Sequence, residues 1–177
     1  MKTTEKFVIP FKGLKIGEHN FRFELDSGFF ERFDGSEIRR GKCTVVVVLT
    51  KNPDMMELRL DIMGSVEVPC DRCLESFDQP VQISETLFVK FAGESIEQME
   101  DLLILSEKEH ELDISGYIYE YIILHLPYQR IHPDDSHGRS MCNKEMIKHL
   151  EEYLTDHETK EHSDPRWEKL RSLLNNN

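Results

Sequence analysis

Two cysteines separated by two residues, Cys70 and Cys73, are the side chains of this chain best suited to chemistry. We call residues 70–73 the knuckle. Apolar and polar residues alternate on both sides of it, which predicts that it is a turn between two strands. Two thiolates at this spacing can bind one face of a tetrahedral metal ion. The same spacing also occurs in redox-active thiol pairs.

The residues that follow the knuckle disfavour a redox role. A thioredoxin-like thiol pair has its first cysteine at the N-terminus of a helix. Here Pro80 opens a new alternating segment, which predicts a strand instead of a helix. We therefore expect Cys70 and Cys73 to be metal ligands or structural thiols.

A metal ion at the knuckle needs two further ligands, and a polar loop later in the chain offers three. His132, His137 and Cys142 follow one another at intervals of five residues. Combined with the two knuckle thiols, they could form a Cys₃His zinc site. A stretch of 58 residues separates Cys73 from His132, so the spacing alone leaves two interpretations open, a zinc site and free structural thiols.

Charge is the second informative property of the chain. The 177 residues carry a formal net charge of −12. Residues 92–115 supply −7 of it, because they contain eight acidic side chains and a single lysine. A solvated acidic loop is the simplest interpretation. The alternative is a docking face for a basic protein, and an acidic surface of this kind repels nucleic-acid phosphates. The eight acidic residues are Glu94, Glu97, Glu100, Asp101, Glu107, Glu109, Glu111 and Asp113.

The N-terminal half predicts strands. Residues 43–49 form a continuous β-branched run that is typical of a central strand, in which Cys43 is a core residue. Alternating apolar residues predict further strands at 21–25 and 56–62, with Gly64 as a bend or bulge before the alternation resumes. Another strand is expected to begin at Pro80.

After residue 91 the apolar period becomes helical. Asp113 is expected to cap a helix that ends before Pro127, and Asn143 is expected to cap the next one. Asp164 and Pro165 predict the start of a last short helix.

These elements predict an α+β protein, with an antiparallel β-sheet or partly open barrel from the N-terminal half followed by C-terminal helices. Residues 1–91 would form the β-rich core that carries the knuckle. Residues 92–127 would contribute the acidic segment and a helix that completes the core, and residues 128–177 a loop and a C-terminal helical region. We expect one domain overall.

The sequence does not predict an enzyme or a membrane protein. It contains no phosphate loop, dinucleotide fingerprint or nucleophile elbow, so we expect no catalytic residue and no small-molecule substrate. No apolar run approaches the roughly 18–20 residues that span a bilayer. The N-terminus lacks a signal-peptide core, which predicts a cytoplasmic protein.

Three motifs in order resemble the YceD family, the large ribosomal RNA subunit accumulation proteins of bacteria and chloroplasts. The first is residues 64–77 around the knuckle, the second is 111–114 followed by 126–127, and the third begins at Asp164. The resemblance spans roughly residues 60–174. Besides the two knuckle cysteines, it rests on Arg72, Leu74, Asp164, Pro165, Arg166 and Trp167.

The resemblance implies a non-enzymatic role in large ribosomal subunit biogenesis, in the accumulation or processing of 23S ribosomal RNA. The genes of this family commonly neighbour the gene for the basic ribosomal protein L32. Since a protein of net charge −12 is poorly suited to binding RNA broadly, we expect an acidic escort of a basic ribosomal protein such as L32. The alternative is a zinc-containing module that binds the 23S rRNA precursor directly.

This chain departs from the family pattern in one respect. Many members carry several cysteines shortly after the Leu-Pro pair, and these would complete a zinc site with the knuckle. Here that stretch holds His132, His137 and the single Cys142. Either a histidine-substituted site binds zinc, or the chain has no metal cofactor and Cys70 and Cys73 are structural.

Overall fold

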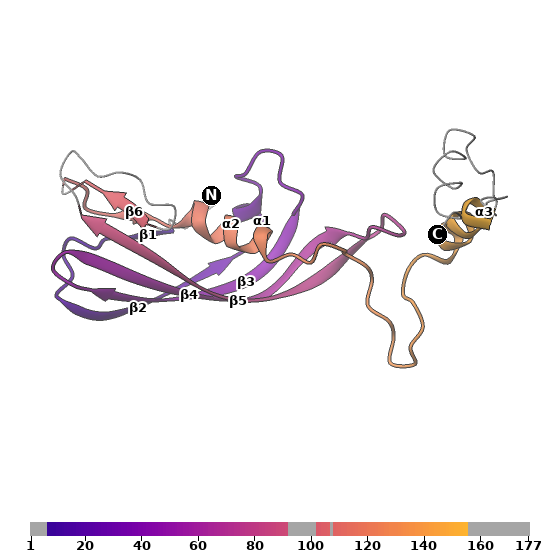
Figure 1. Ribbon diagram of the computed structural model, residues 1–177, viewed down its shortest axis with the longest axis horizontal. Coiled ribbons are helices and arrows are strands. Elements are labelled where there is room, and N and C mark those ends of the chain that lie inside the picture. Colours follow the sequence, from indigo (N-terminus) through magenta and orange to yellow (C-terminus); the bar gives the residue numbers. More distant parts are fainter. Residues whose placement is uncertain (1–6, 92–101, 107, 156–177) are drawn as a thin grey trace, which may run out of the picture.

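The computed structural model describes residues 7–91, 102–106 and 108–155, and its architecture is α+β (Figure 1). A five-stranded open sheet has the order β2-β3-β4-β5-β6, and β1 and β7 form a separate two-stranded sheet. The predicted fold class is confirmed, as an open sheet and not a closed barrel. The strands are β1 (Val8–Ile9), β2 (Gly17–Leu25), β3 (Arg40–Lys51), β4 (Met55–Pro69), β5 (Ser76–Phe91), β6 (Leu102–Leu105) and β7 (Leu112–Asp113). The helices are α1 (Ser27–Phe30), α2 (Ser115–Leu124) and α3 (Lys144–Thr155).

Strands β2 to β5 pair antiparallel in chain order, and each step reaches further toward one end of the sheet. Strand β2 ends where Leu25 faces Cys43, and β3 begins where Arg40 faces Glu67. The β4–β5 hairpin continues beyond both, to the pair of Pro69 and Ser76. The knuckle that connects β4 to β5 therefore lies at the projecting end of the sheet (Figure 1).

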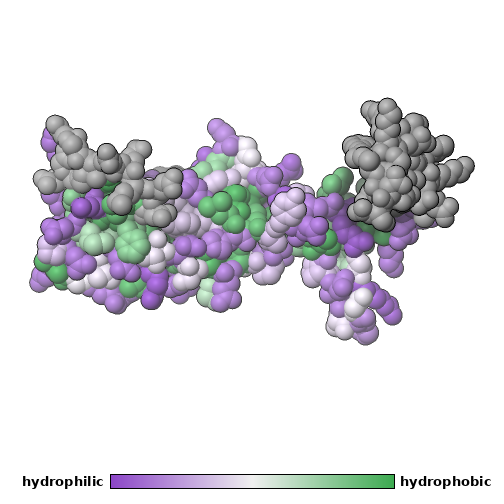
Figure 2. Space-filling view, in the orientation of Figure 1, coloured by the Kyte–Doolittle hydropathy of each residue, from purple (hydrophilic) through white to green (hydrophobic). Residues whose placement is uncertain are grey.

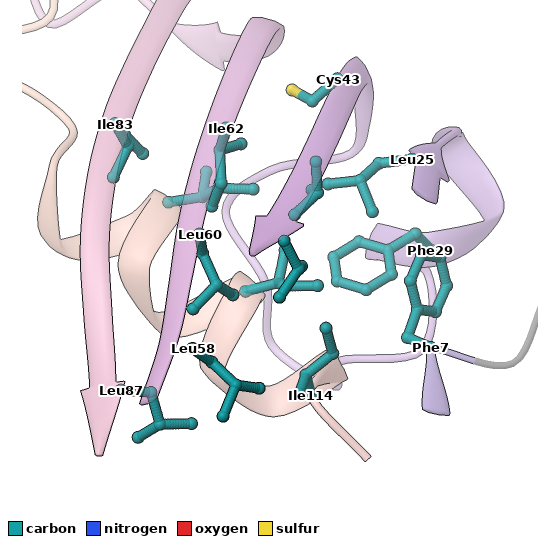
Figure 3. Packing of buried hydrophobic residues seen from close by; sticks show 14 of the residues in the cluster. Phe7, Leu25, Phe29, Cys43, Leu58, Leu60, Ile62, Ile83, Leu87 and Ile114 are labelled. Atoms are coloured by element: carbon teal, nitrogen blue, oxygen red, sulfur yellow. The ribbon is translucent and has the colours of Figure 1, made fainter. Parts of the chain in front are cut away.

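One face of the sheet is buried and the other is open. Along most of β3, β4 and β5, side chains buried in the main core alternate with more exposed ones, as a half-buried antiparallel sheet requires. Leu58, Leu60 and Ile62 of β4 are fully buried at its centre (Figure 3). The alternation predicted from the sequence is confirmed, and Cys43 is a core residue, 1% exposed.

The buried face is covered by the N-terminal segment and by the two helices α1 and α2. Phe7 contacts Phe29 of α1 edge-on, with ring centroids 4.8 Å apart. Figure 3 shows both rings beside Leu25 and Ile114. Ile118 and Ile122 of α2 complete the core from above the sheet.

Helix α2 is apolar on almost all sides, although only Ile118 and Ile122 are fully buried. Leu124 at its end is 77% exposed. Figure 2 shows hydrophobic side chains gathered over the middle of a largely hydrophilic face, where α1 and α2 lie in Figure 1. Partial burial of the Tyr121 hydroxyl raises the pKa of Tyr121, and nearby Glu85 adds to the shift.

The N-terminal caps of α2 and α3 are close to those predicted from the sequence. Asn143 caps α3 as predicted, since its Oδ1 accepts hydrogen bonds from the backbone N–H groups of Glu145 and Met146. Asp113 lies one position further out than predicted. It precedes the N-cap residue Ile114, and its Oδ1 accepts from the backbone N–H of Ser115 at 2.8 Å.

One proline and one glycine, Pro80 and Gly64, differ from the sequence prediction. Strand β5 begins at Ser76, so Pro80 lies inside it. A proline is tolerated here because β6 pairs only with residues 88–91 of β5. At Pro80 the only neighbouring strand is β4, so the missing N–H leaves no second strand without a hydrogen bond. Gly64 is not a bulge, because the register runs through it without interruption.

Gly64 is required by close approach of the neighbouring strand. Its φ is +158°, and a Cβ built there would lie 2.2 Å from the carbonyl oxygen of Lys42 and 2.6 Å from the Cα of Cys43. The strands β3 and β4 therefore approach each other only because this residue has no side chain.

Replacing Gly64 with alanine should destabilise the fold. The backbone contact must open to admit the methyl group, which costs about 1–3 kcal/mol or more. Denaturant unfolding would measure the loss. The matched control is Gly116→Ala in α2, where a Cβ meets nothing within 4 Å and stability should be unchanged or rise by up to about 1 kcal/mol. Equal stability of the two variants would contradict this account of Gly64.

Candidate metal centre

The knuckle is a tight turn held by its own backbone. The N–H of Cys70 donates to the carbonyl oxygen of Glu75 at 2.9 Å, and the N–H of Leu74 donates to the carbonyl oxygen of Cys70 at 2.9 Å. The N–H of Arg72 lies 3.5 Å from the Cys70 sulfur. This geometry turns both thiols to the same side, where Cys70 is 0% and Cys73 2% exposed.

A later segment returns to the knuckle through reciprocal hydrogen bonds. The N–H of Asp71 donates to the carbonyl oxygen of Arg130, and the N–H of Arg130 donates to Oδ2 of Asp71, both at 2.7 Å. The Arg130 guanidinium also bridges to Glu37. Because His132 follows Arg130 by two residues, this contact brings its ring to the thiols.

The start of α3 supplies the remaining ligand. Cys142 directly precedes the capping residue Asn143, whose side-chain amide donates to Oε1 of Glu75 at 2.6 Å. The backbone N–H of Cys142 donates to the hydroxyl of Ser140 at 3.2 Å. The helix start is therefore joined to the residue two positions beyond Cys73.

Four ligand atoms converge as a result. One atom each of Cys70, Cys73, His132 and Cys142 lies within 4.8 Å of all the others. The sulfurs of Cys70 and Cys142 are 3.8 Å apart, and the Cys73 sulfur is 3.4 Å from Nδ1 of His132. Sulfurs bound at ~2.3 Å to a tetrahedral zinc ion would be ~3.8 Å apart. The donor set and its spacing therefore fit a tetrahedral metal ion.

The four residues form a small core of their own, separate from the core under the sheet. The three thiols are buried together, and Ile131, Met146 and Ile147 pack against them. Phe77 touches both cores, and its ring lies 4.8 Å from the His132 ring between centroids. Apolar cover of this kind excludes water from a metal centre.

The surroundings of the site shift the pKa values of two of its thiols in opposite directions. Burial acts to raise the pKa of Cys70, but backbone N–H groups of Cys73 and Arg72 and the nearby His132 outweigh it and lower the pKa to about 6. This lowering favours the thiolate form of Cys70, which is the form that binds a metal ion. Ser140 acts to lower the pKa of Cys142, yet burial and the neighbouring thiols leave it raised. In the main core, burial raises the pKa of Cys43 to about 11, which keeps that thiol protonated.

The structure brings together four of the five metal ligands predicted from the sequence. The fifth, His137, is exposed, with Nδ1 3.1 Å from the hydroxyl of Ser136, and is not in the group of converging atoms. Sequence reasoning missed Asp71, Arg130 and Glu75 as the residues that join the segments. A polar residue between two cysteines gives no signal of a partner 59 positions away.

The predicted partner-binding carboxylates are only partly within the described ranges. Glu109, Glu111 and Asp113 are exposed. The remaining predicted positions lie outside the described residues, as do the predicted C-terminal helix and its motif. They are Glu94, Glu97, Glu100, Asp101, Glu107, Asp164, Pro165, Arg166 and Trp167.

Removing the Asp71 carboxylate should weaken metal binding without unfolding the sheet. Asp71→Ala deletes the acceptor for the Arg130 N–H and loosens the position of His132, so affinity for zinc should fall about 10- to 100-fold. Competition with a chromophoric chelator measures this. Asp78→Ala removes the same charge from an exposed site in the same hairpin and should leave the affinity unchanged. A similar loss in both variants would mean that net charge, not positioning, is responsible.

Comparison with known proteins identifies the family of this chain. No helix in the described ranges is both long and apolar enough to cross a membrane. No curated protein and no solved structure matches the chain. The family model described as large ribosomal RNA subunit accumulation protein YceD matches residues 58–174, from near the start of β4 through the knuckle and beyond α3. The chain therefore belongs to the YceD family, whose name denotes a role in the accumulation of large-subunit ribosomal RNA.

Proposed function

We propose that this protein is a cytoplasmic, non-enzymatic factor in large ribosomal subunit biogenesis. In this proposal it supports the accumulation of 23S rRNA by binding a basic ribosomal protein, such as L32, before assembly. Membership of the YceD family supports the role in accumulation of large-subunit ribosomal RNA. The choice of a protein partner over RNA rests on one observation, the excess of exposed carboxylates.

This excess is found at both ends of the described structure. At the projecting end, Asp71, Glu75 and Asp78 are exposed on the β4–β5 hairpin. At the other end, Glu109 and Glu111 are exposed beside β7. With a net charge of −12, such a surface attracts a basic protein within about one Debye length, roughly 8 Å at physiological ionic strength, and repels phosphates.

We further propose that the metal centre binds zinc. Three thiolates and one imidazole are a donor set that zinc prefers, and a closed four-ligand site is typical of structural zinc. Cys70, Cys73, His132 and Cys142 would hold the ion. It would fix the segment around residue 132 and the start of α3 against the hairpin, a structural task that requires no open coordination position.

Replacing His132 and replacing His137 should have different effects on the amount of bound zinc. His132→Ala should lower the bound zinc from about one ion per chain to well below one half, since a ligand is lost. His137→Ala is the matched control and should retain the full amount. Elemental analysis of protein purified without added metal measures both. Absence of stoichiometric zinc from the wild-type protein would end this proposal.

A second candidate function is favoured by the location of the metal centre. A compact metal-centred tip with an exposed arginine, Arg72, is an arrangement that could contact the 23S rRNA precursor directly. This alternative requires that the positive charges at the tip dominate the neighbouring carboxylates.

Affinity capture with and without nuclease distinguishes the two candidates. If the protein is an acidic escort, a basic large-subunit protein such as L32 should remain bound after RNA digestion, and binding should weaken as salt rises. Quantitative mass spectrometry and RNA sequencing of the same eluates provide the readout. Loss of every partner on RNA digestion would contradict the escort and support the RNA-binding module.

A charge variant provides the control for this experiment. Glu109→Gln combined with Glu111→Gln removes two exposed charges of the acidic segment and should weaken capture of the basic protein. Glu18→Gln on β2 removes an exposed charge outside that segment and should have a smaller effect. Equal capture by all three proteins would show that Glu109 and Glu111 do not contribute to binding of the basic protein.

A further inference from the structure

Leu74 is an unusual residue for its place in the knuckle turn. Its φ is +62°, the only positive φ among non-glycine residues in the described ranges, and this left-handed region favours glycine. The side chain is also 71% exposed. Packing therefore does not explain a leucine here. A strained backbone that presents an apolar side chain to solvent is a pattern associated with binding sites.

A surface cavity lies directly beside this side chain. Its volume is about 310 Å³, and Leu74 and Pro69 form its apolar lining. The carboxylates of Glu37 and Glu67 and the guanidinium of Arg39 supply charged groups around it. We call this cavity the knuckle pocket. Its volume is at the lower end of ligand sites, which suits one or two side chains of a protein segment.

The charges of the knuckle pocket include one carboxylate that a cation can bind. Glu37 is already paired with Arg130, which ties the pocket rim to the segment that carries His132. Glu67 has no ion pair or side-chain hydrogen bond with any residue that the structure describes. Glu67 and Arg39 are therefore the lining charges that remain, and Glu67 is the one that favours a cationic group.

We propose that the knuckle pocket binds a segment of a basic protein in which an apolar side chain stands next to a lysine or arginine. The apolar side chain packs against Leu74 and Pro69, and the cation pairs with Glu67. The source of that segment, a large-subunit ribosomal protein, rests on the proposed function. The net acidic charge of the chain indicates only that the partner is basic. The pocket indicates in addition that an apolar side chain stands next to the cation.

Leu74→Gly separates binding from folding at this position. Glycine adopts a φ of +62° without strain and the lost side chain is largely exposed, so the unfolding midpoint should be unchanged or higher and metal content unchanged. Binding of the partner should fall at least about tenfold, because an apolar anchor in a pocket carries much of an interface. Glu67→Gln should weaken binding and reduce its salt dependence.

The probe is total protein extracted from large ribosomal subunits, presented to the tagged full-length protein in parallel with deproteinised 23S rRNA. The captured protein is identified, purified and titrated against each variant. Met141→Ala is the matched control, since Met141 is 58% exposed and does not line the pocket. It should bind as the wild type does.

The outcomes separate the pocket from the proposed function. Capture of a basic protein by the wild type and by Met141→Ala, with loss in Leu74→Gly, supports the proposal. Equal affinity in Leu74→Gly overturns the pocket and leaves the escort function standing. Capture of 23S rRNA alone, or of nothing, overturns both.

Discussion

The meeting of two distant chain segments at Cys70, Cys73, His132 and Cys142 is the constraint on which the projecting end of this protein depends. The sheet needs no help from it, because its core is complete under β2–β5 and does not include these thiols. Among the described residues, the small thiol core and polar contacts such as those of Asp71 and Asn143 join the return segment and α3 to the hairpin. A metal ion bound by these four residues would be the main interaction that holds the return segment and α3 in place.

The fold explains why such a centre is placed where it is. Each successive strand reaches further, so the β4–β5 hairpin projects and its turn is free of neighbours from the sheet. A turn so placed can face a partner on its outer side while its thiols bind a metal on the inner side. Leu74 and the pocket beside it lie on the turn that the metal centre would stiffen. Rigid presentation of a binding residue lowers the entropy cost of association.

Much of the fold could be predicted from the sequence, because period-two alternation at 56–62 and the β-branched run at 43–49 report burial directly. The parts that failed depend on distant partners. Pro80 is read locally as a strand start, yet its place in β5 is set by how little of that strand β6 covers. Gly64 is read as a bend or bulge, whereas the approach of Lys42 and Cys43 from the next strand requires it. At the site, residue types identified the ligands, but the placement of His132 at the thiols depends on the Asp71–Arg130 contact, which no spacing reveals.

We propose that the four converging side chains bind one zinc ion. X-ray absorption spectroscopy at the zinc edge, on protein purified without added metal, tests it most directly. We expect about three sulfur neighbours at ~2.3 Å and one nitrogen at ~2.0–2.1 Å in a single tetrahedral shell. A spectrum without zinc, or with a shell of oxygen and nitrogen alone, would contradict the account.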